Sequence, residues 1–105
     1  MDEKKLVTRP SSWLDDWYVI EYENGWDISD ASVEGPRDHI TAIAQAVIDG
    51  RAESHKRCAV DTTSDGGFVF WSPRNSMGRG DHIPKDVAVA WAKSTLDYFA
   101  SNPRA

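Results

Sequence analysis

Alternating apolar and polar positions predict a first β-hairpin over residues 17–29, WYVIEYENGWDIS. An Asn-Gly pair at residues 24 and 25 marks its turn. A two-residue loop would place the apolar side chains of the two strands on opposite faces, whereas a three-residue loop over residues 23–25 places them on one face. We therefore expect the three-residue loop, with Gly25 in the left-handed conformation. The facing pairs would be Tyr22 with Trp26 and Ile20 with Ile28.

The same rule predicts a second hairpin over residues 56–72, KRCAVDTTSDGGFVFWS. Its three-residue loop would span residues 64–66, with Gly66 in the role of Gly25. The facing pairs would be Thr62 with Phe68 and Val60 with Phe70. Cys58 would join the apolar face of this hairpin, and as the only cysteine of the chain it cannot form an internal disulfide.

Apolar residues spaced three and four apart predict a helix after each hairpin. The first helix lies within residues 35–50, where Pro36 suits the first turn and Gly50 suits the end. The second follows Pro84 and stops before Pro103. The two apolar stripes are Ile40, Ile43, Ala44, Val47 and Ile48 in the first helix, and Val87, Ala90, Trp91, Thr95, Tyr98 and Phe99 in the second.

The resulting order is ββαββα, and a shared Asp-His-Ile tripeptide at residues 38–40 and 81–83 suggests a pseudo-repeat. We predict an α+β fold: one four-stranded, mainly antiparallel sheet with both helices packed on one face. Residues 1–12 would form a flexible N-terminal arm, residues 13–102 a single domain, and residues 103–105 a C-terminal tail.

Charge is distributed unevenly along the 105 residues, which carry a net charge of −5. Residues 1–50 hold 4 basic and 11 acidic side chains, whereas residues 51–105 hold 8 and 6. The acidic half argues against general nucleic-acid binding, which needs a basic stripe. No apolar run reaches the length of a membrane span, and the lone cysteine suits a reducing, cytoplasmic setting.

The acidic strand surface is the first candidate site. In the predicted register Glu21 lies opposite Asp27, and like charges in this arrangement destabilise a sheet. Lys56 and Arg57 on a neighbouring strand would compensate them, or a basic partner would. Trp71 would point to the same helix-free face and serve as an interface anchor, unless the arm or a second subunit covers it. The predicted partner-binding residues are Glu21, Glu23, Asp27 and Trp71.

The long polar segment of residues 71–84, WSPRNSMGRGDHIP, is the second candidate. Long ordered loops are often functional, and this one leads to a helix N-terminus, which favours anions. It matches no phosphate-loop signature, so a surface connection and a plain tether stay open alternatives. The candidate ligand- or anion-binding residues are Arg74, Asn75, Ser76, Arg79 and His82. Three histidines without a paired-ligand motif do not predict a metal site, and we expect no cofactor.

Three functions follow from these patterns. We favour a small, non-enzymatic protein-binding or regulatory module, of the phage or bacterial accessory, immunity or inhibitor type. Its acidic sheet face would contact a basic protein, such as one that handles nucleic acid. One alternative is nucleic-acid or anion binding through residues 71–85 and 51–57. The other is a small enzyme centred on His82. A homodimer through the sheet edges is a further expectation.

Overall fold

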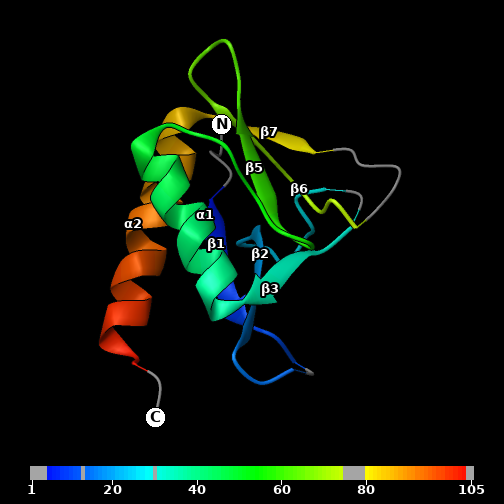
Figure 1. Cartoon of the computed structure of the whole chain (residues 1–105), viewed down its shortest axis with the longest axis vertical. Helices are drawn as coiled ribbons and strands as arrows, with labels where there is room; N and C mark the ends of the chain where they lie inside the picture. Colours follow the sequence, from blue (N-terminus) through cyan, green and yellow to red (C-terminus); the bar gives the residue numbers. More distant parts are fainter. Residues whose placement is uncertain (1–4, 13, 30, 75–79, 104–105) are drawn as a thin grey trace.

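The strands form two antiparallel sheets in the computed structural model, which describes residues 5–12, 14–29, 31–74 and 80–103 (Figure 1). The elements in chain order are β1 (Leu6–Pro10), β2 (Trp17–Tyr22), β3 (Val33–Pro36), α1 (Arg37–Asp49), β4 (Glu53–Ser54), β5 (Ala59–Thr62), β6 (Phe68–Trp71), β7 (Asp81–Ile83) and α2 (Lys85–Ser101). One sheet has the order β1-β2-β3 and the other β4-β5-β6-β7. The α+β class is confirmed, but the prediction of a single four-stranded sheet is wrong.

The first hairpin has the three-residue turn that its pattern predicts. The Tyr22 N–H donates to the Trp26 carbonyl at 2.9 Å, Glu21 faces Asp27, and Gly25 has a φ of 92°. The pairing then changes, because Ile20 pairs with Val33 of β3 instead of Ile28. The expected Ile20–Ile28 pair is therefore wrong.

The second hairpin follows its predicted register throughout. Val60 faces Phe70 and Thr62 faces Phe68, as a three-residue loop requires. Gly66 has a φ of 86°, a conformation that other residues rarely adopt. The core face of this hairpin is formed by Cys58, Val60, Phe68 and Phe70, all of which are buried.

The N-terminal segment is part of the fold, contrary to the expected flexible arm over residues 1–12. Within the described part of that segment, β1 pairs antiparallel with β2 from Leu6–Tyr22 to Pro10–Tyr18. Leu6 is only 3% exposed and belongs to the core. β1 therefore occupies the edge of β2 that the predicted single sheet would have offered to the second hairpin.

The helix boundaries agree with the sequence signals. α1 begins after Pro36 and ends at Gly50, whose φ of 71° is left-handed. α2 begins after Pro84 in the same way. The predicted pseudo-repeat is not confirmed: the tripeptide at residues 38–40 lies in α1, whereas the tripeptide at residues 81–83 forms β7.

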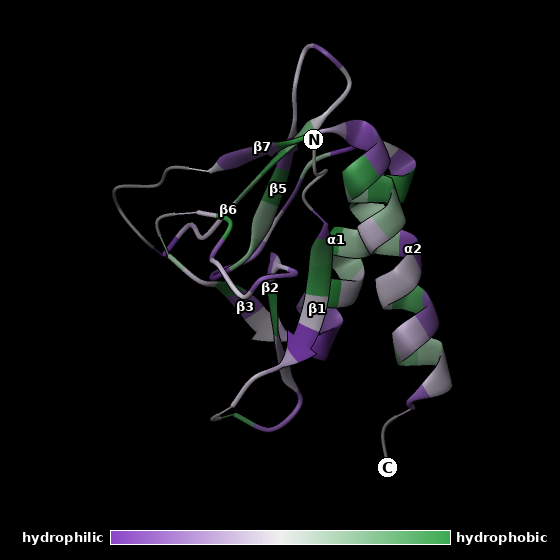
Figure 2. Cartoon of the chain, turned by 180° about the vertical axis from the view of Figure 1, so that it is seen from behind, coloured by the Kyte–Doolittle hydropathy of each residue, from purple (hydrophilic) through white to green (hydrophobic). Residues whose placement is uncertain are grey.

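The core lies between the helices and the two sheets. Figures 1 and 2 show α1 and α2 packed together along one side of the molecule with the strands on the other. Ser29 and Gly80 form an isolated bridge at which the two sheets approach each other. A side chain at Gly80 would come within 2.7 Å of the Phe70 carbonyl oxygen of β6, so the close packing of this position against β6 needs glycine. Neither helix, over the residues described, has the length and apolar character needed to cross a membrane.

Candidate functional site

The turn of the first hairpin holds the most exposed of the large apolar side chains in the described part of the chain. Trp26 is 72% exposed, whereas the sequence pattern predicted it on the apolar face of the hairpin. The backbone around it is well fixed, because the Trp26 N–H donates to Asn24 Oδ1 at 3.0 Å and the Gly25 N–H donates to the Tyr22 carbonyl at 2.8 Å. We call residues 22–27 the hairpin tip.

Acidic side chains flank Trp26 on both sides. Glu21 forms an ion pair with Arg9 of β1, and the Arg9 guanidinium also donates to the Glu23 carbonyl oxygen at 2.9 Å. The predicted compensation of Glu21 by Lys56 and Arg57 is therefore wrong, because the missing cation comes from β1. Asp27 is exposed, and its carboxylate accepts a long hydrogen bond of 3.5 Å from the Ser32 hydroxyl. The hairpin tip thus retains negative charge next to the indole.

Trp71, the fourth predicted partner-binding residue, is not part of the first hairpin. It is half-buried at the end of β6, in the four-stranded sheet, and it pairs with Ala59 of β5. Glu21 and Asp27 belong to the first hairpin, in the other sheet. The four residues predicted as one partner-binding site therefore divide between the two sheets.

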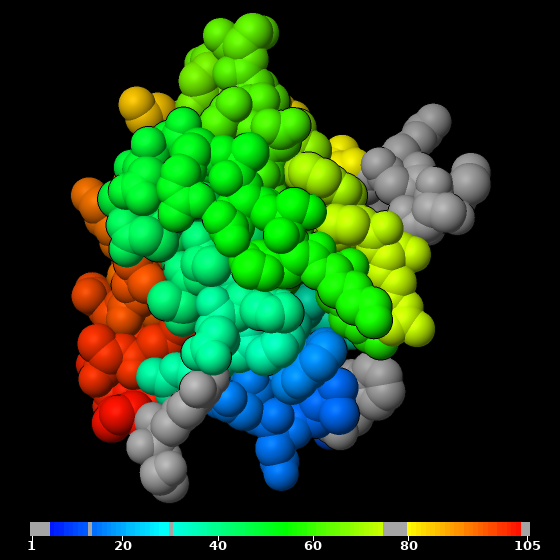
Figure 3. All heavy atoms as spheres, viewed as in Figure 1, coloured from blue at the N-terminus to red at the C-terminus, as the bar shows by residue number. Residues whose placement is uncertain are grey.

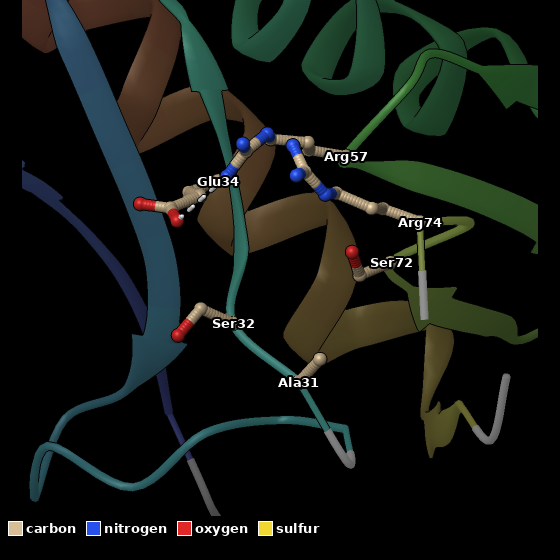
Figure 4. Close-up of a pocket in the computed structure, with 6 residues that line it drawn as sticks. All are labelled: Ala31, Ser32, Glu34, Arg57, Ser72 and Arg74. Carbon is tan, nitrogen blue, oxygen red and sulfur yellow. Dashed lines mark ion pairs between the residues drawn. The ribbon is translucent and has the colours of Figure 1, made fainter. Parts of the chain in front are cut away.

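A charged groove consists of two hollows that share Ser32 and Glu34: the first lies on the three-stranded sheet, and the second is also lined by residues next to β5 and β6. The first has a volume of about 320 Å³ and is lined by Arg9, Pro10, Ser11, Ser12, Val19, Glu21, Asp27, Ser32 and Glu34. The second has a volume of about 310 Å³ and is lined by Ala31, Ser32, Glu34, Arg57, Ser72 and Arg74 (Figure 4). The groove brings one arginine from each of the two predicted basic segments into a single hollow.

Comparison with known proteins gives no further indication of function. The chain matches no protein-family model, no curated protein and no solved structure.

The polar segment of residues 71–84 is only partly within the described residues. Asn75, Ser76 and Arg79 lie outside them, whereas Arg74 lines the groove. His82 lies on β7, where its Nε2 is 3.0 Å from Asp65 Oδ2 in the β5–β6 turn, which projects from the molecule in Figure 3. Arg74 and His82 are therefore in different surroundings and do not form one site.

The neighbours Asp81 and His82 point to opposite faces of β7, as successive strand residues do. Asp81 accepts a hydrogen bond from the Tyr22 hydroxyl at 2.8 Å, and burial together with this carboxylate raises the pKa of Tyr22. Asp65 accepts hydrogen bonds from the Thr63 hydroxyl and the Gly67 N–H, and these lower its pKa, with His82 adding to the effect. Asp81 and His82 therefore contact different partners, and His82 pairs with Asp65.

The sequence did not indicate that His39 and His55 lie together. The rings of His39 and His55 stack with their centroids 4.3 Å apart, and burial followed by the neighbouring His55 lowers the pKa of His39. His55 Nε2 lies 2.7 Å from Glu53 Oε2, but the contact is not aligned as a hydrogen bond, so we treat it as electrostatic. Across the described ranges, no three histidine, cysteine or carboxylate side chains are placed to hold a metal ion.

Cys58 is expected to be chemically inert in the folded protein. Its thiol is fully buried, and burial together with the nearby Glu53 charge raises its pKa to about 12. At pH 8 only about one molecule in ten thousand would then carry the reactive thiolate. Iodoacetamide at pH 8, followed by mass spectrometry, should leave the native protein unmodified and label the urea-unfolded protein completely. Rapid labelling of the native protein would contradict the burial of this thiol.

Proposed function

We propose that this chain is a protein-binding module whose contact surface is the hairpin tip, with Trp26 as its anchor. The observation that carries the proposal is an indole that is 72% exposed on a hydrogen-bonded turn. Tryptophan is enriched among the residues that dominate binding energy at protein interfaces. A side chain held on a rigid backbone loses little conformational freedom on binding, so more of its contact energy appears as affinity.

The charge around the anchor favours a basic partner. Glu23 and Asp27 flank Trp26 at exposed positions, and the whole chain is acidic. Lys5 forms an ion pair with the Glu23 carboxylate, with its Nζ 3.8 Å away, but both side chains are exposed and such pairs are weak. An acidic surface would speed the encounter with a basic protein.

Two arrangements support protein binding over the alternatives. Two arginines of the second half contact carboxylates: Arg51 pairs with Asp49 and Glu53, and Arg57 pairs with Glu34. These carboxylates interrupt a basic track for nucleic acid along residues 51–57. Asp81 accepts from the Tyr22 hydroxyl and points away from His82, so a catalytic pair formed by Asp81 and His82 is disfavoured. An accessory, immunity or inhibitor protein in the cytoplasm would act through binding of this kind.

The proposal is tested by affinity capture of partners from a lysate of the host cell, with the captured proteins quantified by mass spectrometry. Trp26→Ala should reduce capture of a basic partner about 30-fold or more, as expected for the loss of a central aromatic anchor. Asp27→Lys should slow association and remove its dependence on salt. Ile48→Ala is the matched control, because Ile48 is a partly exposed apolar residue on α1, outside the hairpin tip. Equal capture by the Trp26→Ala and Ile48→Ala proteins would refute the proposal.

A further inference from the structure

The hollow at the β3–β6 end of the charged groove contains two like-charged side chains next to each other. Figure 4 shows the guanidinium groups of Arg57 and Arg74 side by side, reaching the hollow from different segments of the chain. Glu34 is the one carboxylate among the described residues that line this hollow. Those residues together carry a net positive charge, although the chain as a whole is acidic.

Arg57 is held in place by protein contacts. Its Nη1 lies 3.7 Å from Glu34 Oε1, and its guanidinium carbon lies 5.4 Å from the centre of the Trp17 ring. The contact with Glu34 is longer than a close charge-assisted hydrogen bond, so the guanidinium keeps donors for another acceptor. Arg57 is thus a preorganised donor at the wall of the hollow.

Arg74 supplies the second cation. It is exposed, and no carboxylate within the described ranges forms an ion pair with it. Two guanidinium groups that lie side by side repel each other unless an anion lies between them. The geometry favours an acceptor that both can share.

Ser72 adds a neutral donor. The residue is only 5% exposed, its side chain lines the hollow, and it makes no hydrogen bond to another described residue. Its hydroxyl can therefore donate a hydrogen bond to a ligand in the hollow. Ser32 places another hydroxyl on the opposite wall (Figure 4).

We propose that Arg57, Arg74 and Ser72 form a binding site for the phosphate group of a small molecule. A phosphate presents several oxygens to two guanidinium forks at once, which a chloride or a single carboxylate does less well. A hollow of about 310 Å³ suits a compact ligand. Nucleic acid would need further free cations along the surface, and the neighbouring Arg9 is already paired with Glu21. This site is separate from the hairpin tip and does not depend on the function proposed for it.

The test is a titration of the full chain with inorganic phosphate at constant ionic strength, followed by NMR of the backbone amides and arginine side chains. Saturable shifts are expected at Arg57, Ser72 and Arg74, and sodium chloride should not reproduce them. Arg74→Gln should weaken phosphate binding about tenfold or more, because it removes a charged donor. Glu34→Gln should strengthen binding severalfold, because it removes the carboxylate that competes for Arg57.

Lys93→Gln is the matched control, since it removes one exposed positive charge from α2, which does not line the groove. The spectra also report whether each variant is folded. Equal phosphate affinity in the Arg74→Gln and Lys93→Gln proteins, or weaker binding in Glu34→Gln, would overturn the site. Tighter binding of a short single-stranded oligonucleotide than of phosphate would overturn the choice of a small ligand.

Discussion

Replacing Trp91 with alanine is expected to lower the free energy of unfolding by about 3–5 kcal/mol, a large share of the roughly 5–15 kcal/mol typical of a domain. Trp91 is 2% exposed and packs edge-to-face on Phe70 of β6, with ring centroids 5.3 Å apart. Its indole N–H donates to the Thr8 hydroxyl of β1 at 2.8 Å. One side chain of α2 therefore contacts a strand from each sheet, and its loss opens a cavity where the two sheets and the helix meet.

Urea unfolding followed by circular dichroism measures the effect. Trp91→Phe separates packing from hydrogen bonding: it keeps an aromatic ring but removes the donor to Thr8, so a loss of about 1–2 kcal/mol is expected. Ile48→Ala should cost about 1 kcal/mol or less, because the Ile48 side chain is partly exposed on a helix that favours alanine. A Trp91→Ala protein that lost no more than the Ile48→Ala protein would show that Trp91 is not central to the core.

Local structure could be predicted from the sequence because neighbouring residues determine it. The parity of a hairpin loop fixes which side chains share a face, so both turns and the register of the second hairpin were correct. Proline fixes the start of each helix and Gly50 the end of the first, in agreement with the structure. None of these inferences needed information about distant parts of the chain.

The division into two sheets could not be predicted in this way. It depends on the first hairpin, whose pairing stops after Glu21 and Asp27, because Ile20 pairs with Val33. It also depends on β1, whose sequence LVTRP has no clear alternation beside the charged N-terminus. Ile28 is apolar because it is fully buried, not because it continues the strand pairing. Alternating apolar residues indicate which side chains are buried, but they do not indicate which strands pair. In the first hairpin, the burial of Ile28 was interpreted as evidence that it pairs with Ile20.

The candidate site was predicted in part. The sequence indicated two basic segments, and Arg57 and Arg74 from these segments do line one hollow. The role of Arg9 was missed because the N-terminal residues were treated as an arm. Trp26 was placed on the apolar face because it continued the alternation, although a residue next to an Asn-Gly turn stands where the chain reverses and is easily exposed.

Deletion of residues 1–10 is expected to lower the free energy of unfolding by at least about 3 kcal/mol, in contrast to the small effect of removing a flexible arm. Burial of a leucine side chain such as Leu6 contributes about 2 kcal/mol. Thr8 accepts the Trp91 N–H at 2.8 Å, and its hydroxyl lies 2.8 Å from that of Thr95, so its removal leaves buried polar groups without partners at a cost of about 1–3 kcal/mol. Deletion also removes Arg9 and leaves Glu21 facing Asp27 without a cation.

Urea unfolding of the truncated chain, combined with hydrogen exchange of the β2 amides, measures this loss, and the exchange should accelerate because β2 becomes an edge strand. Lys5→Gln in the full chain is the control: it breaks only the exposed contact with Glu23, so a change below about 0.5 kcal/mol is expected. Thr8→Val isolates the buried hydroxyl and should give an intermediate loss, because valine keeps the shape of the side chain but accepts no hydrogen bond. If the truncated and full-length chains unfolded at the same urea concentration, β1 would contribute nothing to the core, and the three-stranded sheet described above would have to be abandoned.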